Sequence, residues 1–324
     1  MSAADLAALS RRNQLSRGIV YMVISTVAFA GVNAIVKWEV AKYPIGEVAF
    51  YRSLFALITV AAIVLPRRGI GVLRTNRLRA HLGRGVSQFG SMTCMFIALS
   101  LMPLGSAAAF SFAAPLFTTL LSIVILKERV GIHRWSALVV GFIGVVVIAH
   151  PGAGAIQPGA LFALANAVLI SSVAIAIRRM SVTESAETMT LYQMAIITLC
   201  TLTLLPFGFV RPGWHDAAML AVAGIGNGIA QIWWTRSLSL APASAVVPFN
   251  YLSLVWAMIL GFAVWGDVPG PDLALGAAIV VGSGLYILWR ETLRRAARRE
   301  LPSPAMRERV EAHPVRDGKG EGTV

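Results

Sequence analysis

Three residues that could bind an organic molecule occur at helical spacing in one apolar stretch of the chain: Asn227, Gln231 and Trp234. Residues separated by four and then three positions lie on one face of an α-helix. An amide offers both donors and acceptors of hydrogen bonds, and an indole offers a flat surface for stacking. The spacing therefore favours a site for a flat, partly polar solute, whereas the alternative is that these side chains only join neighbouring helices.

A second stripe of candidate residues, Gln88, Met92 and Met95, repeats this spacing in another apolar stretch. Thioethers are polarizable and make favourable contacts with aromatic rings. Asn33 is a further amide inside an apolar stretch, where a polar group is costly and is therefore a functional candidate. We expect the two stripes to face each other across one site and Asn33 to be a further residue of its wall.

Arg52 is the one base that lies well inside an apolar stretch. Its guanidinium could receive a carboxylate or phosphate of a ligand, pair with Glu47, or extend to the membrane surface. Asn250 and Tyr251 follow Pro248, which frees backbone carbonyls that either a cavity or helix packing must satisfy. We include Arg52, Asn250 and Tyr251 among the expected substrate-binding residues.

The elements that must position these residues are transmembrane helices. Of the 324 residues, 57% are hydrophobic and 13% are charged, and the mean hydropathy is +0.72, which excludes an ordinary soluble domain. Because a helix needs about 20 apolar residues to cross a ~30 Å hydrocarbon layer, we predict an all-α integral membrane protein with ten transmembrane helices. Pro115 and Pro248 should interrupt the fourth and ninth of them. The expected spans are Gly18–Trp38, Glu47–Leu65, Gly85–Met102, Ser106–Leu126, Trp135–His150, Gly159–Ile177, Thr188–Phe207, Ala217–Thr235, Ala243–Trp265 and Leu273–Trp289.

The distribution of basic residues predicts the orientation of these spans. With the N terminus inside, 24 of the 28 Lys and Arg residues fall on the inner side, and only Lys37, Lys42 and Arg211 fall outside. Excess positive charge in short loops stays cytoplasmic, so we expect both termini on the cytoplasmic side of a bacterial-type inner membrane. The bases form short clusters between apolar runs, which indicates membrane topology and no nucleic-acid partner.

An internal repeat divides the chain into two halves. The segment 98–108 aligns with 237–247 at an offset of 139 residues, which pairs Pro103 with Pro242 and Gln88 with Asn227. Each copy contains five expected spans, so the second copy must be inverted in the membrane, as in many transporters. The expected division is a cytoplasmic segment at 1–17, a first repeat at 18–150, a second repeat at 151–290 and a disordered cytoplasmic tail at 291–324.

Four motifs support a family resemblance: Gly31-Val-Asn33, Arg52-Ser-Leu-Phe-Ala56, Ala98-Leu-Ser-Leu-Met-Pro103 and Lys127-Glu128-Arg129. Over residues 18–290 the chain resembles the EamA-type branch of the drug/metabolite transporter superfamily, in the subgroup that includes riboflavin and S-adenosylmethionine uptake carriers. The resemblance implies a central cavity lined by spans one to four and six to nine, with spans five and ten peripheral. The second copy departs from the family pattern at Asp267, where the family usually has Gly-Glu.

Other kinds of chemistry find little support in the sequence. No expected span contains a central Asp, Glu or His, so a carboxylate relay for proton coupling is not indicated. The histidines and the two cysteines, Cys94 and Cys200, lack the spacing of metal ligands, and no phosphate-binding loop is present. We therefore expect neither a metal nor another cofactor. The paired acids, or acid with histidine, that a membrane-embedded enzyme would need at the membrane boundary are not evident either.

These observations predict a secondary transporter that moves a small organic metabolite across the inner membrane by alternating access, and not an enzyme. We favour uptake of a heterocyclic, cofactor-like compound such as riboflavin, because the stripes offer stacking and amide contacts. The alternatives are uptake of S-adenosylmethionine, efflux of amino acids or drugs, and an enzyme acting on lipid-linked substrates. Besides the substrate and the bilayer, the glycines of spans five and ten could serve either a homodimer or internal packing.

Overall fold

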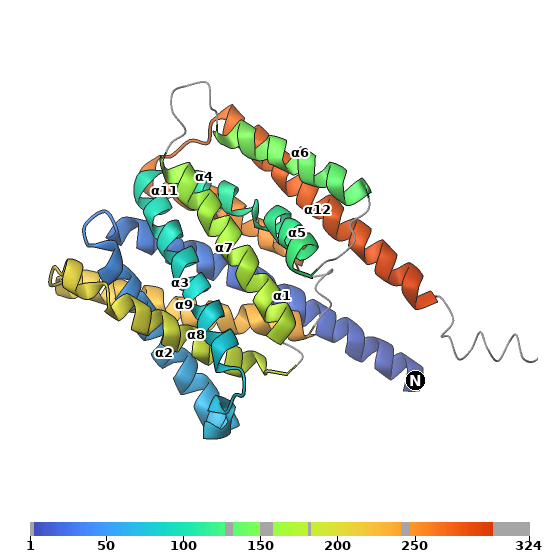
Figure 1. Ribbon diagram of the computed structural model, residues 1–324, viewed down its shortest axis with the longest axis horizontal. Coiled ribbons are helices and arrows are strands. Elements are labelled where there is room, and N and C mark those ends of the chain that lie inside the picture. Colours follow the sequence, from blue (N-terminus) through green and yellow to red (C-terminus); the bar gives the residue numbers. More distant parts are fainter. Residues whose placement is uncertain (1–2, 127–131, 150–157, 181–182, 241–246, 301–324) are drawn as a thin grey trace, which may run out of the picture.

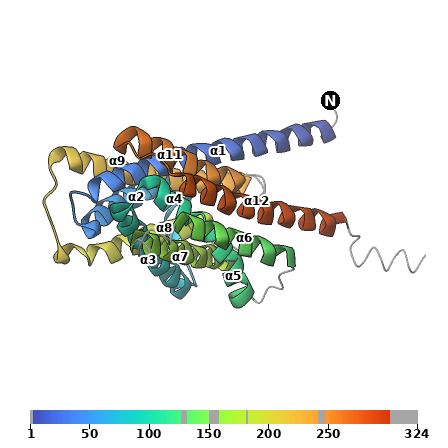
Figure 2. The ribbon, with the colours of Figure 1, turned by 90° about the horizontal axis from the view of Figure 1, so that it is seen from above.

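The computed structural model describes residues 3–126, 132–149, 158–180, 183–240 and 247–300. Within these ranges the regular structure is helical and contains no strand. The N terminus and the end of α12 lie at the same end of the bundle in both views (Figure 1, Figure 2), and we call this end proximal and the opposite end distal. The helices are α1 (Ala3–Glu39), α2 (Ile45–Arg68), α3 (Leu78–Leu101), α4 (Leu104–Ser111), α5 (Ala114–Leu126), α6 (Ile132–Ala149), α7 (Pro158–Met180), α8 (Ala186–Leu202), α9 (Trp214–Leu240), α11 (Leu252–Trp265) and α12 (Pro271–Glu300), with the 3-10 turns η1 (Ile70–Leu73), η3 (Leu205–Phe207) and η4 (Val247–Tyr251).

Most of these helices are long and apolar enough to lie across a membrane. Among the described residues, six segments qualify by length and composition, and three shorter apolar helical segments accompany them. Large apolar side chains such as Val20, Ile58 and Val139 are exposed on their surfaces, as lipid contact allows. The predicted class, an all-helical membrane protein, is confirmed. The expected span at Gly85–Met102 lies in α3, which is not among the segments that qualify.

The contacts between helices follow a two-fold pattern that relates the two repeats. Helix α1 packs against α9, and α7, which opens the second repeat, packs against α3. In the same way α2 contacts α9, and α8 contacts α3. When each helix is exchanged with its counterpart in the other repeat, the contact of α1 with α9 becomes that of α7 with α3, and the contact of α2 with α9 becomes that of α8 with α3. The two repeats therefore interlock instead of standing side by side. This arrangement places a helix of one repeat against a helix of the other throughout the centre of the bundle.

Two of the expected spans are interrupted near their prolines. The fourth consists of α4 and α5, which are separated at Phe112 and Ala113, directly before Pro115 in the first turn of α5. Proline has no N–H to donate to the carbonyl of Ser111, so the helix breaks where that bond would form. In the ninth, Pro248 lies in η4 and the regular helix α11 begins only at Leu252. The predicted interruptions are thus confirmed, while residues 241–246 lie outside the described residues.

Helices extend into both end segments of the sequence-based division. Residues from Ala3 onward are already part of α1, and α12 continues to Glu300, past residue 291, where a disordered tail was expected to start. Residues 291–300 are Glu, Thr, Leu, Arg and Ala, most of which favour helix, so the polar composition of this segment did not end α12. Helix α12 thus includes 291–300 of the expected tail, while the rest of that tail, like the motif at 127–129, lies outside the described residues.

The helices α6 and α12 form a pair at the edge of the bundle (Figure 1). Their axes approach closely at two glycines, because a Cβ on Gly276 would lie 2.7 Å from the carbonyl oxygen of Gly144. A Cβ on Gly144 would in turn lie 3.0 Å from the carbonyl oxygen of Gly276. Small residues let two backbones come this close. These two glycines therefore serve internal packing of the peripheral pair.

Candidate binding cavity

A cavity of about 460 Å³ lies between the two repeats at the centre of the bundle. Among the described residues, its lining comes from α1, α2, α3, α4, α7, α8, α9, η4 and α11, and from neither α6 nor α12. The family resemblance implied this division between lining and peripheral helices, and the structure confirms it. The volume is within the range of roughly 300–1,000 Å³ that is usual for small-molecule sites.

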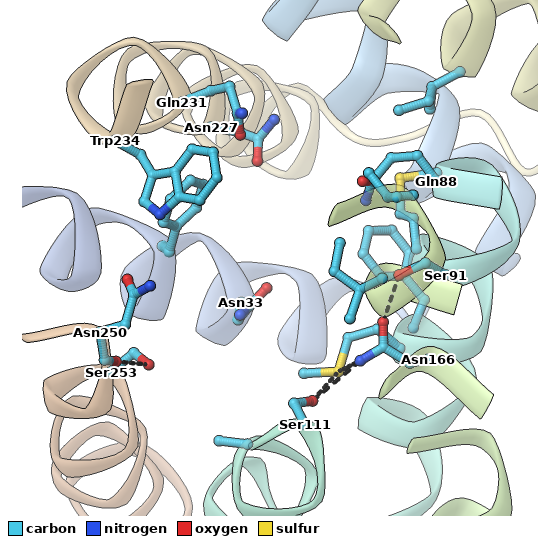
Figure 3. A pocket seen from close by; sticks show the side chains of 18 of the residues that line it. Asn33, Gln88, Ser91, Ser111, Asn166, Asn227, Gln231, Trp234, Asn250 and Ser253 are labelled. Carbon is cyan, nitrogen blue, oxygen red and sulfur yellow. Dashed lines mark hydrogen bonds between the residues drawn. The ribbon is translucent and has the colours of Figure 1, made fainter. Parts of the chain in front are cut away.

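The stripe of α9 forms one wall of this cavity. Asn227, Gln231 and Trp234 point into it from the same helix face, and Gln88 of α3 lies across from them (Figure 3). Asn33 of α1 lies between the two walls in the same view. In the predicted helical register, the amides and the indole thus face one common cavity.

Arg52 extends from α2 into the cavity and joins the two walls. Its Nη1 donates a hydrogen bond to Oδ1 of Asn227 at 2.9 Å, and its Nη2 lies 2.8 Å from the sulfur of Met92. The guanidinium carbon also lies 5.0 Å from the ring centroid of Phe96, a cation–π contact. Its Nε is buried and has no hydrogen-bond partner among the described residues. The guanidinium is therefore held in place with donor capacity left over.

The expected alternative of a pair between Arg52 and Glu47 is wrong. Oε2 of Glu47 accepts a hydrogen bond from the backbone N–H of Val210 at 3.0 Å. No ion pair joins Arg52 to any described carboxylate. Glu47 lies in the first turn of α2, at the distal end, and its carboxylate points to the loop before α9 instead of along its own helix.

A polar node on the opposite wall joins three helices. Asn166 of α7 accepts a hydrogen bond from Ser91 of α3 at 2.7 Å and donates one to Ser111 of α4 at 3.1 Å (Figure 3). The sulfur of Met95 lies 3.7 Å from the Ser111 hydroxyl. These hydrogen bonds join α3, α4 and α7 to one another beside the cavity.

Nine of the ten expected binding residues line the cavity: Asn33, Arg52, Gln88, Met92, Met95, Asn227, Gln231, Trp234 and Asn250. Tyr251 does not, which corrects its inclusion. Its ring packs on Phe112 at a centroid distance of 5.0 Å, and its hydroxyl lies against Gly284 of α12. Consecutive residues point in different directions from a helical turn, and here Asn250 faces the cavity while Tyr251 packs on Phe112 and α12.

The sequence reasoning missed several polar residues of the lining, among them Ser91, Arg84, Asn166 and Gln193. Asn166 and Gln193 are amides within the expected spans six and seven, so the cost of a polar group in a membrane could have indicated them. Arg84 had been counted among the loop bases, one residue before the expected third span. It donates to the carbonyl of Met189 at 2.6 Å and to Oε1 of Gln193, so it joins α3 to α8 beside the cavity.

The charge of the cavity is one-sided. Its described lining contains two arginines, Arg52 and Arg84, and neither aspartate nor glutamate. Buried cations without an acidic partner favour ligands that offer carbonyl, carboxylate or phosphate oxygens.

Contacts between the repeats close the bundle at its distal end. Asp216 at the start of α9 accepts from Lys42 at 2.8 Å and from the hydroxyl of Tyr43 at 2.7 Å, and we call these three residues the distal clasp. The hydrogen bond to Asp216 raises the pKa of Lys42 and that of Tyr43 above their ordinary values. The rings of Trp38 and Trp265 pack beside the clasp with their centroids 6.2 Å apart.

Other contacts join the repeats at the proximal end. Arg68 of α2 and Glu187 of α8 form an ion pair at 3.1 Å, and the hydroxyl of Thr188 donates to the carbonyl of Val72 at 2.8 Å. The hydroxyl of Ser237 on α9 donates to the carbonyl of Gly18 on α1 at 2.7 Å. The cavity therefore lies between two sets of contacts, each of which crosses from one repeat to the other.

One acid–histidine pair that the sequence did not suggest lies near the proximal end. His81 of α3 and Glu184 approach to 3.6 Å, and both side chains are buried. The other carboxylate oxygen of Glu184 accepts from Thr75, and the ring of His81 stacks on Tyr192. The pair joins α3 to the turn before α8 and is not among the described lining residues of the cavity. Among the described residues no group of three or more metal-ligating side chains occurs.

Comparison with known proteins gives consistent matches over nearly the whole chain. The model of the EamA-like transporter family matches residues 16–150 and 157–289. The chain is 28% identical to the S-adenosylmethionine uptake transporter of Rickettsia prowazekii, covering 87% of this chain and 96% of that protein. It is 30% identical to the riboflavin transporter of Rhizobium johnstonii, covering 86% and 92% respectively. It is also 27% identical to the pseudopaline exporter CntI of Pseudomonas aeruginosa, covering 82% and 94%.

A solved structure with 23% sequence identity superposes with a TM-score of 0.56 and covers 82% of this chain and 96% of the other. Its likeness supports the fold alone.

Proposed function

The chain belongs to the EamA-like transporter family, and from this premise we propose that it imports a heterocyclic metabolite, with riboflavin as the leading candidate. That it is a small-molecule transporter follows from the family and from relatives that are named as transporters and align with this chain over most of their length. The proposal concerns the substrate, the direction of transport and the residues that bind the cargo.

The observation that carries the proposal is the pair of walls across the cavity. Trp234 offers a flat stacking surface, and Asn227, Gln231 and Gln88 offer amides that can both donate and accept. The isoalloxazine ring of riboflavin is flat and alternates carbonyl oxygens with ring nitrogens along one edge. Arg52 lines the same cavity, and its guanidinium could donate to such a carbonyl.

S-adenosylmethionine is the second candidate, because two relatives named as S-adenosylmethionine uptake transporters align with this chain over 96% and 93% of their own length. Its sulfonium and ammonium groups are cationic, whereas the described lining contains two arginines and no acid. Like charges in a site of low dielectric repel, so the cavity favours an uncharged or anionic heterocycle. One relative is named as an exporter, and efflux is the corresponding alternative for the direction.

We further propose that the two sets of contacts between the repeats open in turn. Opening of the distal clasp would admit cargo from outside, and opening of the proximal contacts would release it. In this arrangement ten helices cross the inner membrane, and the proximal end with both termini is cytoplasmic, as the excess of Lys and Arg there suggests.

The test of substrate and site is uptake into proteoliposomes that contain the purified chain. Riboflavin, S-adenosylmethionine and a mixed amino-acid pool are compared, with and without an imposed pH gradient. We expect saturable riboflavin uptake that Trp234→Ala reduces about two- to tenfold, because a stacking contact contributes about 0.5–1.5 kcal/mol beyond buried area. Trp233→Ala is the matched control, since Trp233 is the next indole on α9 and is not among the described lining residues. Transport of amino acids alone, or equal losses in both variants, would contradict the proposal.

The orientation is tested by labelling single cysteines in whole cells with a reagent that does not cross the membrane. The two native cysteines, Cys94 and Cys200, are first replaced by serine. We expect Gly213→Cys, at the distal end, to be labelled from outside and Thr75→Cys, at the proximal end, to be protected. The reverse pattern would overturn the proposed orientation.

A further inference from the structure

A second pocket, of about 560 Å³, opens at the proximal end between α1, α2, α8 and α9. Four arginines line it: Arg17 of α1, Arg67 and Arg68 of α2, and Arg236 of α9. Its one described acid, Glu187, is engaged by Arg68 at 3.1 Å. Arg68 and Glu187 balance each other, and Arg17 and Arg67 add two positive charges that no acid of the described lining offsets. A surplus of this size in one pocket attracts an anion.

The deeper part of this pocket is apolar. On α2, Val60, Ile63 and Val64 precede Arg67 by three to seven residues, and on α9 Ile232 precedes Arg236 by four. At a rise of 1.5 Å per residue, the apolar side chains begin about 5–10 Å further into the bilayer than the guanidinium groups. The hydroxyls that line the pocket belong to Tyr21, Thr190 and Thr235.

We propose that this pocket binds an anionic phospholipid, whose phosphate contacts the arginines and whose acyl chains cover the apolar floor. The groups of a phospholipid follow the same order along the membrane normal as the side chains of the pocket. A charged phosphate lies at the surface, ester oxygens lie below it and hydrocarbon lies deeper still. A soluble phosphate compound would satisfy the arginines but would leave Ile63 and Ile232, the half-buried residues of the floor, uncovered. The depth of the apolar lining therefore favours a lipid of the leaflet at the proximal end.

Bound lipid at this position would act on transport through two shared helices. Gln231 and Trp234 of α9 face the central cavity, while Ile232 and Thr235 of the same helix face the pocket. The pocket also takes its arginines from both repeats, so one headgroup would join them at the end where Arg68 and Glu187 already do so. We therefore expect an anionic lipid to alter the transport rate, whichever metabolite is carried.

The pocket is tested with the full-length protein in vesicles of phosphatidylcholine with and without phosphatidylglycerol. Retained lipid is measured by native mass spectrometry after detergent extraction, and its affinity by titration. We expect phosphatidylglycerol to bind, and the double variant Arg17→Gln with Arg67→Gln to weaken binding about 10- to 30-fold. The matched control is Arg74→Gln with Arg79→Gln, which removes the same charge from exposed positions at the same end, outside the pocket.

Two results would overturn the proposal. Equal loss of binding in the control pair would mean that general surface charge, and not the pocket, attracts the lipid. Competition by glycerol phosphate or inorganic phosphate at the same concentration as the lipid would mean that a soluble anion is the ligand. This competition uses the unmodified protein, so it decides the question even if the double variant does not fold.

Discussion

Replacing Arg52 by methionine separates its proposed role in binding from a role in joining helices. Arg52→Met keeps most of the aliphatic stem and removes the guanidinium, with its bonds to Asn227 and Met92. If the spare donor of Arg52 contacts the cargo, the variant loses a hydrogen bond from a charged group. We expect the dissociation constant for riboflavin to rise about 10- to 150-fold, and the protein to remain as stable as before.

The magnitude follows from what each group loses. A hydrogen bond to a charged partner contributes about 1.5–3 kcal/mol, and about 1.4 kcal/mol corresponds to a tenfold change in affinity. For stability, Oδ1 of Asn227 loses its donor, which costs about 1–3 kcal/mol. Removal of a buried charge that has no described carboxylate partner relieves a desolvation penalty of several kcal/mol. The two changes oppose each other, so the free energy of unfolding should not fall.

The assay combines isothermal titration with riboflavin and thermal unfolding of the purified protein in detergent. Arg211→Met serves as control, because it makes the same chemical change at an exposed loop position of the distal end. A variant that binds riboflavin normally but unfolds several degrees earlier would refute the reasoning. Arg52 would then be a residue that joins α2 to α9 and α3, and the site would rest on the amides and Trp234 alone.

Two further predictions concern the peripheral helix pair and the distal clasp. Gly276→Ala should lower the free energy of unfolding by about 1–3 kcal/mol, since its Cβ would meet backbone of α6. The control Gly282→Ala should leave this free energy unchanged, because nothing lies within 4 Å of the added Cβ. Thermal unfolding of the two variants tests the prediction. A single cysteine at Ala108, which lines the cavity, reports access to it in the cysteine-free background. Asp216→Asn should speed labelling of this Ala108→Cys variant from outside, whereas the control Asp272→Asn should not. Equal labelling rates would contradict a closing role for the clasp. In the unmodified clasp, labelling should be slowest near neutral pH, because the folded state holds the proton of Lys42 more tightly and the proton of Asp216 less tightly than free groups do. Labelling should rise when the pH passes above the raised pKa of Lys42, and again when it falls below the lowered pKa of Asp216.

Much of the architecture could be predicted because it depends on local sequence. Apolar runs of membrane length determine which segments become spanning helices, and a proline determines where one of them breaks, as at Pro115. The face of a helix is likewise a local property, so the register of Asn227, Gln231 and Trp234 was enough to predict that they share one wall. The polar residues missed at Asn166 and Gln193 were visible to the same reasoning.

Tyr251 shows where local sequence stops being sufficient. Its place beside Asn250 suggested a shared role, but the start of α11 turns its ring toward Phe112 and Gly284. The direction in which a residue points after an irregular turn depends on the helices that pack there, and no local pattern specifies them.

The sequence by itself determined the membrane class, the two repeats and the residues of each helix face, because periodicity and composition act over a few turns. Only the tertiary structure decided which groups meet. It paired Glu47 with the N–H of Val210, leaving Arg52 to Asn227, and brought His81 to Glu184. It also gathered four arginines from three helices around one apolar pocket. These partners are far apart in the chain, and their distances depend on how the two repeats interlock, which is set by packing across the whole bundle.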